Sequence, residues 1–346
     1  MKLATLKSHG RDGKEGRDGK LVVVSKRLAH YVEVPAIAAT LQAALDDWQL
    51  LAPSLEGVYQ RLNNGEEKDY KVFQSSECLA PLPRAYQRVD GSAYVNHLEL
   101  VQKARGSKIH DKFWTDPFMY QGGSDKMIGA HAGVEVVSEE FGIDFEAEIA
   151  VITDDVPMHI SAQQAPHHIR LITLLNDVSL RNLVPEELES GFGFLHSKPA
   201  TAFSPVAITL DELGEAWQNS KIHLPLNTTY NGTLFGRPNA GIDMTFNFSE
   251  LIAHAAKTRH LSAGTIIGSG TVSNQDSSVG SSCIAERRML EILARGTATT
   301  GFMKFGDHVR IEMFNNEGES LFGAIDQYVI EHAISEEEVR YTSAFE

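Results

Sequence analysis

The sequence predicts a mixed, β-rich protein in which a small α+β N-terminal domain precedes a larger, mostly β domain. Residues 1–82 combine short β-branched runs with two stretches of helical periodicity. From about residue 90 onward, short β-type runs separated by turn residues dominate, without a regular alternation of strands and helices. We therefore expect closed or sandwich-like sheet packing for the second domain, residues 83–346.

The N-terminal domain is predicted to contain three strands and two helices. The strands are expected at residues 3–6, 21–24 and 30–34. The first helix, over residues 37–51, follows from Leu41, Leu45 and Trp48, which recur at helical spacing. A second helix is expected over residues 55–62. Pro81 and Pro83 then mark a connector into the larger domain.

In the larger domain the helical stretches are few. Strands are predicted at residues 146–152, 171–178, 207–210, 224–230, 265–268, 308–314 and 322–330. Helices are predicted at residues 165–174, 248–256 and 286–294. Asn231-Gly232 and the segment Asn315 to Gly318 are typical of hairpin turns between neighbouring strands.

Composition excludes several classes of protein. The chain of 346 residues is 42% hydrophobic and 22% charged, which is too apolar for a disordered chain. A net charge of −15 argues against nucleic acid or an anionic membrane as a partner, although a small anionic substrate remains compatible. Cys78 and Cys283 are too few for a disulfide framework and are expected to be reduced. Without a membrane-spanning run or a signal-peptide core, a cytoplasmic location is expected.

The segment GIDFEAEIAVIT, residues 142–153, carries two carboxylates in an apolar strand. Glu146 and Glu148 are two residues apart, so their side chains leave a strand on the same face. Two neighbouring carboxylates repel each other and are costly to desolvate, and a divalent cation relieves both penalties. Oxygen ligands without a His or Cys cluster favour Mg²⁺, Ca²⁺ or Mn²⁺. The alternative is that both side chains line the solvated face of an edge strand.

Asp177 is a third candidate. It lies where the apolar run of LLNDVSLRN turns polar, which is typical of a site but equally of a plain helix or strand cap.

Five motifs in order resemble the fumarylacetoacetate hydrolase family. They are DFEAEIAVI, NDVSLRN, HSKPATAFSPVA, AGTIIGSGTVSN and FMKFGDHVRIE, within residues 85–332. The resemblance implies a β-sandwich roll, often dimeric, so a homodimer is expected. It places Glu146, Glu148 and Asp177 on the family's metal carboxylates, with Mg²⁺ as the expected ion. Some members add an aspartate where this chain has Asn96, whose carbonyl oxygen is an alternative ligand.

The same resemblance suggests a catalytic base. His97 matches a base position, and Glu99, two residues on, is a candidate partner that orients the ring. Family members usually have a wider spacing between the two residues, at which this chain has Leu100. Glu286 is the other candidate partner of His97, or else a helix N-terminal carboxylate. The plain alternative is a surface His-Leu-Glu segment.

Four further residues match family positions around the metal. Lys198 and Arg181 are candidate cations for a substrate carboxylate, and Lys198 also for an oxyanion. Thr271 matches a substrate-contacting threonine, and Gln121 stands where several members carry a lysine.

The resemblance implies hydrolysis of a carbon–carbon bond in a small anionic β-diketo or 2-oxo acid. The named candidate is fumarylacetoacetate, which yields fumarate and acetoacetate in tyrosine catabolism. Acylpyruvate hydrolases, oxaloacetate decarboxylases and 2-oxo acid hydratases or isomerases resemble the chain through the same carboxylates. A catalytically silent metal-binding protein is the alternative from another class.

Overall fold

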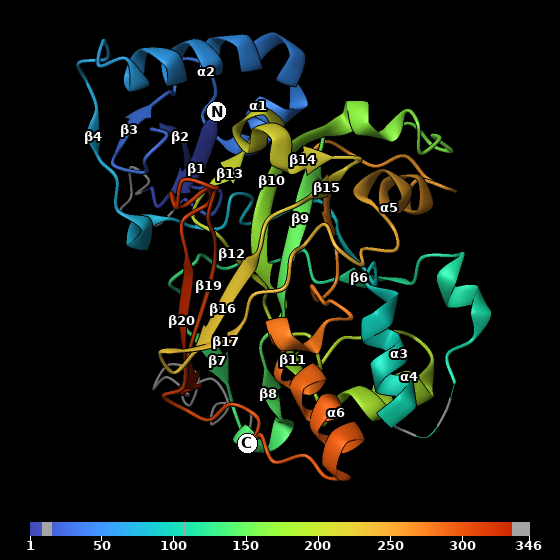
Figure 1. Ribbon diagram of the computed structural model, residues 1–346. Helices are drawn as coiled ribbons and strands as arrows, with labels where there is room; N and C mark the ends of the chain where they lie inside the picture. Colours follow the sequence, from blue (N-terminus) through green and yellow to red (C-terminus); the bar gives the residue numbers. More distant parts are fainter. Residues whose placement is uncertain (9–15, 105, 107, 334–346) are drawn as a thin grey trace, which may run out of the picture.

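The computed structural model describes residues 1–8, 16–104, 106 and 108–333, and a long sheet runs through it (Figure 1). Its strand order is β4-β3-β2-β1-β13-β10-β9-β18-β5-β6, and β12 also pairs with β10. The strands are β1 (Lys2–Leu6), β2 (Lys20–Val24), β3 (His30–Glu33), β4 (Lys71–Val72), β5 (Arg88–Gly91), β6 (Met119–Gly122), β9 (Ala147–Thr153), β10 (Ile169–Asn176), β12 (Ala202–Phe203), β13 (Ala207–Ile208) and β18 (Ile266–Gly268).

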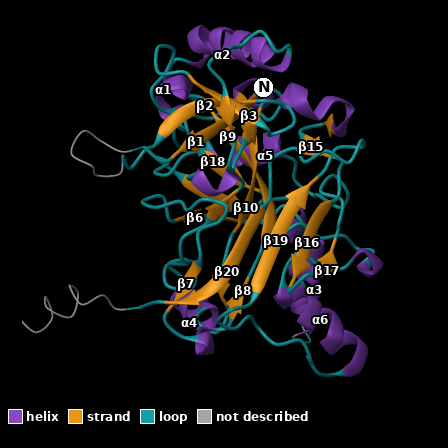
Figure 2. Ribbon diagram, turned by 90° about the vertical axis from the view of Figure 1, so that its left-hand side faces the viewer, coloured by secondary structure: helices purple, strands orange, loops and turns teal. Residues whose placement is uncertain are grey.

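A second, five-stranded sheet lies against the first, with the order β17-β16-β19-β20-β7 (Figure 2). These strands are β7 (Val134–Val136), β16 (Leu226–Tyr230), β17 (Thr233–Gly236), β19 (His308–Met313) and β20 (Ile325–Glu331). β19 and β20 contact β10, and β16 contacts β9, so the two sheets form a sandwich. Two small ribbons complete the strands: β8 (Ile143–Asp144) with β11 (Ser179–Leu180), and β14 (Trp217–Gln218) with β15 (Lys221–Ile222).

The helices lie in separate groups around the sheets (Figure 1). At one end are α1 (Leu41–Asp46) and α2 (Trp48–Asn63); elsewhere are α3 (Val95–Ala104), α4 (Val184–Ser190), α5 (Phe248–Ala255) and α6 (Ile284–Arg295). Short 3₁₀ helices are η1 (Ser75–Glu77), η2 (Asp111–Trp114), η3 (Glu139–Phe141), η4 (Ala165–His168), η5 (Leu210–Ala216) and η6 (Ser277–Val279). Among the described residues, no helix is long and apolar enough to cross a membrane.

The central strands β9 and β10 are covered on both faces. Ile149 and Val151 of β9 belong to the core between the two sheets. Ala150 and Ile152 belong to a second core, which also contains Leu41 of α1 and several residues of α2. A strand covered on both sides needs an almost continuous apolar sequence, which explains the run from residue 147 to 152. A charged group in these strands is therefore tolerated only near their ends.

The N-terminal strands extend the long sheet. β1 pairs with β13, where Lys2 is opposite Ile208 and Leu3 is opposite Ala207. The sheet thus continues across the division between residues 82 and 83 that the sequence predicts.

Both predicted hairpin turns are confirmed. Asn231 and Gly232 have φ angles of 48° and 75° and join β16 to β17. Positive φ at both residues matches the right-handed twist of the flanking strands. The Asn315 to Gly318 turn lies between β19 and β20.

The helix predicted for residues 165–174 is wrong. Only η4 is helical there, and β10 begins at Ile169 and pairs with β9 along its length. A short apolar run has the same appearance in a buried helix and a buried strand, and here the sheet pairing decides.

Candidate metal and catalytic site

Three carboxylates from different strands converge at the end of the central sheet. Asp90 lies in β5, Glu148 in β9, and Asp177 directly follows β10. One oxygen of each lies within 4.8 Å of the other two, and all three side chains are buried. We call Asp90, Glu148 and Asp177 the acidic trio. The trio differs from the predicted set because it contains Asp90 in place of Glu146.

β18 separates β5 from β9, and its Gly268 lets the carboxylates meet across it. A Cβ atom on Gly268 would lie 2.4 Å from Asp90 Oδ2 and 3.3 Å from Glu148 Oε2. Any side chain at this position would displace Asp90, so the glycine is a requirement of the acidic trio.

The acidic trio holds more negative charge than the neighbouring cations neutralise, as is typical of a cation site. Burial, reinforced by the charge of Asp177, raises the pKa of Asp90 to about 7. Burial, together with Asp90 and Asp177, raises the pKa of Glu148 well above its usual value. Glu148 Oε2 is buried and has no hydrogen-bond partner among the described residues. Three converging hard oxygen donors with one unpaired atom fit Mg²⁺, Mn²⁺ or Ca²⁺.

Two buried cations pair with carboxylate oxygens of Asp90, Asp177 and Glu146. Arg88 donates from Nη1 to Asp90 Oδ2 at 2.9 Å and from Nη2 to Asp177 Oδ1 at 3.0 Å. Lys198 Nζ lies 2.7 Å from Asp177 Oδ2 and 2.6 Å from Glu146 Oε2. Burial alone would raise the pKa of Asp177, but Arg88 and Lys198 lower it below its usual value. The same carboxylates raise the pKa of Lys198, which is therefore an ammonium ion at neutral pH.

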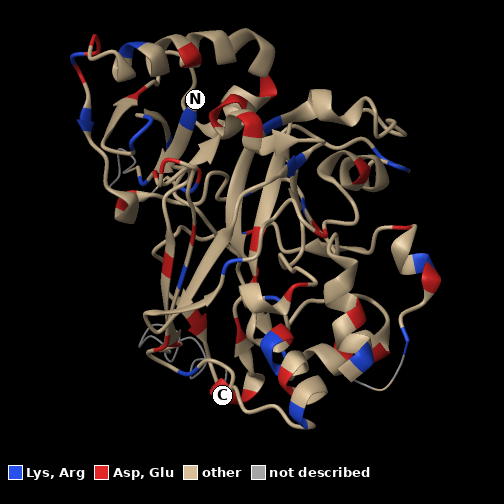
Figure 3. Ribbon diagram, in the orientation of Figure 1, with Lys and Arg blue, Asp and Glu red and all other residues tan. Residues whose placement is uncertain are grey.

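Glu146 lies beside the acidic trio and is paired with cations. Arg181 bridges two carboxylates, with Nη2 2.5 Å from Glu146 Oε1 and Nε 2.8 Å from Asp144 Oδ2. Burial opposes ionisation of Glu146, but Arg181 and Lys198 outweigh it and lower its pKa. In Figure 3, acidic and basic positions lie side by side toward the lower ends of the central strands. Glu146 is therefore ionised and shares Lys198 with the acidic trio.

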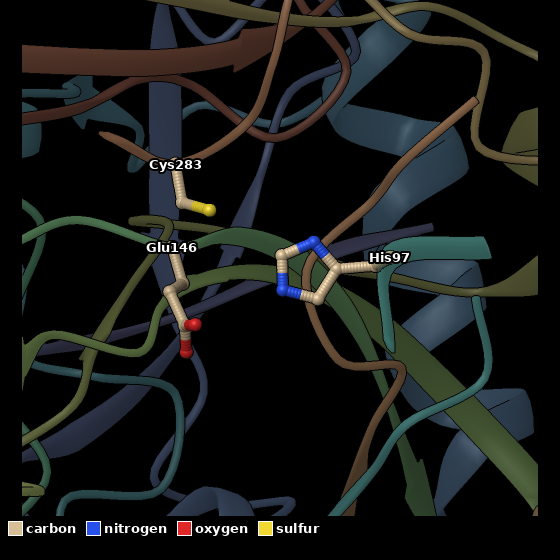
Figure 4. Close-up of side chains that lie close together, drawn as sticks. All are labelled: His97, Glu146 and Cys283. Atoms are coloured by element: carbon tan, nitrogen blue, oxygen red, sulfur yellow. The ribbon is translucent and has the colours of Figure 1, made fainter. Parts of the chain in front are cut away.

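His97 is held by a glutamate from another helix. His97 Nδ1 lies 2.6 Å from Glu286 Oε2, and the two residues belong to α3 and α6, which pack together. Figure 4 shows the imidazole pointing toward Glu146 and Cys283, and ligand atoms of these three residues lie within 4.8 Å of one another. Burial raises the pKa of the Cys283 thiol well above its usual value. Cys283 is thus a neutral thiol, and its sulfur accepts a hydrogen bond from Glu286 N at the start of α6.

Most of the predicted site residues line one cavity of about 160 Å³. The structure places seven of them there: His97, Glu146, Glu148, Asp177, Arg181, Lys198 and Thr271. Glu286 lies behind His97, through the hydrogen bond described above.

Three residues singled out in the sequence lie elsewhere. Glu99 pairs with Lys103 on α3 at 2.9 Å. Gln121 lines a different cavity, beside His254 and Lys257. Asn96 is buried, and its side-chain amide donates to Ser273 Oγ at 2.8 Å.

Asp90, Arg88 and Asp144 were not singled out in the sequence. The only signal for the first two was local: in the segment RVDG, Arg88 and Asp90 alternate with an apolar residue just before a glycine.

Comparison with known families decides where this chain belongs. A family model described as "Fumarylacetoacetate (FAA) hydrolase C-terminal" matches residues 88–330, and one described as "Fumarylacetoacetase N-terminal domain 2" matches residues 1–84. The chain belongs to the fumarylacetoacetate hydrolase family. The family and the β-rich fold expected from the sequence are thereby confirmed.

Curated members of the fumarylacetoacetate hydrolase family include oxaloacetate tautomerases. YisK from Bacillus subtilis is 28% identical over 197 residues, which is 56% of this chain and 61% of that protein. The mitochondrial oxaloacetate tautomerase Fahd2a of Rattus norvegicus is 24% identical over 56% of this chain and 58% of its own length. The match thus spans about three fifths of these relatives.

Solved structures of the fumarylacetoacetate hydrolase family share the fold. Maleylpyruvate hydrolase from Sphingobium sp. SYK-6, solved in complex with manganese(II) ion and pyruvate, superposes with a TM-score of 0.63 at 15% identity. The superposition covers 96% of this chain and 100% of that chain.

The first prediction concerns ion binding. Glu148→Gln should weaken Mn²⁺ binding by about 100-fold or more in isothermal titration calorimetry, since loss of an outer-shell partner alone costs about 10–100-fold. The matched control, Glu99→Gln, removes a carboxylate paired only on the helix surface and should bind Mn²⁺ like the unmodified protein. Equal affinities in both variants would contradict the acidic trio as the ion site.

The second prediction concerns Asp144, which accepts hydrogen bonds from the N–H groups of Ile284 and Ala285 at the start of α6 and from Arg181. Asp144→Ala leaves a buried cation short of a partner, so the free energy of unfolding should fall by about 3–5 kcal/mol in urea denaturation. Asp155→Ala is the control. It removes an exposed carboxylate that accepts only from Ala263 N and should cost about 1 kcal/mol. Equal losses in the two variants would contradict the role assigned to Asp144.

Proposed function

We propose that this protein is a metal-dependent enzyme that hydrolyses a carbon–carbon bond in a β-diketo acid. The observation that carries the proposal is the His97–Glu286 pair, which faces the same cavity as the acidic trio. A positioned imidazole beside a cation site provides a base for water and a means of polarising a carbonyl. Fumarylacetoacetate is one acid of this class.

The acidic trio, with Glu146 beside it, would hold a divalent ion. When bound, such an ion supplies Lewis-acid polarisation of the substrate carbonyl and enolate oxygens.

The chain's own residues would carry the protons and place the substrate. Glu286 holds Nδ1 of His97, and with no hydrogen-bond partner for Nε2 among the described residues, Nε2 is the atom that would take a proton from water. The resulting hydroxide adds to the carbonyl carbon, and Lys198, which lines the cavity, donates to the oxyanion. The bond to the central carbon then breaks, its electron pair forms an enolate, and His97 returns its proton to that carbon. Water is consumed, and one carboxylic acid and one methyl ketone are formed.

The substrate carboxylate would lie at the Gly-rich turn that carries Thr271. Gly270 has a φ of 74°, and a Cβ atom there would lie 2.2 Å from Gly91 O, so only glycine fits this turn. Gly270 and Thr271 both line the cavity. Arg181 lines the cavity but already donates to Asp144 and Glu146, which favours a positioning role over substrate binding.

A second candidate is the tautomerisation of a 2-oxo acid such as oxaloacetate. The named relatives from Bacillus subtilis and Rattus norvegicus favour it. The same residues would serve, since His97 could move a proton between carbon and oxygen without consuming water.

The test uses purified protein with Mg²⁺ or Mn²⁺, and again after EDTA, on a panel of β-diketo acids and on oxaloacetate. The account expects metal-dependent cleavage of at least one β-diketo acid, with ¹⁸O from labelled water in the new carboxylate. Accelerated keto–enol conversion of oxaloacetate without any cleavage would replace the hydrolase with the tautomerase. No turnover of any acid would overturn both.

The third prediction concerns the base. His97→Asn should lower kcat by about 100-fold or more, because the proton acceptor is lost. Glu286→Gln should lower kcat by about 10-fold, because the imidazole of His97 loses the carboxylate that orients it. His196→Asn is the control, since that side chain is 81% exposed. Undiminished kcat in His97→Asn would remove His97 from the mechanism.

A further inference from the structure

The cations around the substrate cavity are already paired with protein carboxylates. Of the described residues that line it, Lys198 contacts Glu146 and Asp177, while Arg181 contacts Asp144 and Glu146. Arg88, behind the lining, contacts Asp90 and Asp177. Each of these three cations therefore already pairs with two protein carboxylates.

Part of the cavity wall is apolar. Leu98 of α3, Val184 of α4 and Phe194 line it. The Phe194 ring meets Tyr120 edge-on, with centroids 5.2 Å apart, and the Tyr120 hydroxyl donates to Asp177. The aromatic surface therefore begins directly beside the acidic trio. Tyr94 adds a second ring to the lining, and its hydroxyl donates to Ala240 O at 2.6 Å.

The loop that carries Phe194 has a defined conformation. Gly191 and Gly193 have φ angles of 75° and 103°, which L side chains rarely adopt. Glu187 of α4 fixes the far end, because its carboxylate accepts from the N–H groups of Leu195, His196 and Ser197. As a result Phe192 is 99% exposed, while Phe194, two residues later, lines the cavity.

We propose that Phe194, with Leu98 and Val184, is the specificity-determining wall that selects substrates whose end remote from the metal is uncharged and apolar. The substrate class is a 2,4-dioxo acid with one carboxylate and an alkyl or aryl acyl group. A second terminal carboxylate would be desolvated against Phe194, where the described cations of the cavity already pair with protein carboxylates, and this is unfavourable. An apolar end gains free energy from the same contact. Fumarylacetoacetate, which carries a carboxylate at each end, is therefore a poor substrate.

The inference rests on the proposed function and is tested with two acids of equal chain length. 2,4-Dioxoheptanoate ends in a methyl group, and 2,4-dioxoheptanedioate ends in a carboxylate. The unmodified holoenzyme should show a kcat/KM at least about 10-fold higher for the first. Phe194→Ala should lower kcat/KM for the first acid by about 10-fold, and Phe194→Arg should reverse the preference.

Phe192→Ala is the matched control on the same loop and should leave the preference unchanged. An unmodified protein that prefers the dicarboxylate, or a preference unaltered in Phe194→Ala and Phe194→Arg, would overturn the inference while the proposed function stands. If neither of these acids nor any other β-diketo acid of the panel is cleaved, the proposed function fails. Calorimetric binding of the same two acids to the Mn²⁺-loaded protein then decides the inference: tighter binding of the monocarboxylate supports it, and equal or weaker binding overturns it.

Discussion

The structure depends on charge balance among ionisable groups buried at the ends of the central strands. Five carboxylates meet there, Asp90, Asp144, Glu146, Glu148 and Asp177, against three cations, Arg88, Arg181 and Lys198. With all groups ionised, the cluster carries a formal charge of −2. Buried charges are stable only when paired or coordinated, so the cluster matches the charge of one divalent ion.

The pKa shifts show which carboxylates lack a compensating positive charge. Glu146 and Asp177, which each contact two cations, have lowered pKa values. Asp90 and Asp144, which each contact one cation, and Glu148, which contacts none of the three, have pKa values raised by burial. Glu148 also carries the unpartnered oxygen. A bound cation would therefore stabilise the acidic trio more than the rest of the cluster. Glu146 lies between the trio, with which it shares Lys198, and His97.

The same cluster connects the proposed ion site to His97, the proposed base. Asp144 accepts from Arg181 and from backbone N–H groups at the start of α6, and α6 carries Glu286. Glu286 in turn holds His97 on α3. The position of the imidazole therefore depends on the buried ion pairs. The central sheet that supports them is covered by the second sheet on one face and by α1 and α2 on the other.

How much of the site the sequence predicts depends on whether the contacts are local. The strand spacing of Glu146 and Glu148 was enough to predict neighbouring carboxylates, and the polar end of an apolar run pointed to Asp177. The sequence does not predict Asp90, because Asp90 reaches the acidic trio only through the pairing of β5 with β18, which lie far apart in the sequence. Proximity along the chain predicts Glu99 as a partner of His97. However, residues two apart on a helix do not face each other, and Glu286 from α6 takes that position.

The most direct test of the central claim is the position of a bound ion. A crystal of the protein with Mn²⁺ should show an anomalous scattering peak among the carboxylates of Asp90, Glu148 and Asp177, with Glu146 adjacent. A peak between His97, Glu146 and Cys283 instead, or no ordered Mn²⁺ at a saturating concentration, would contradict the account.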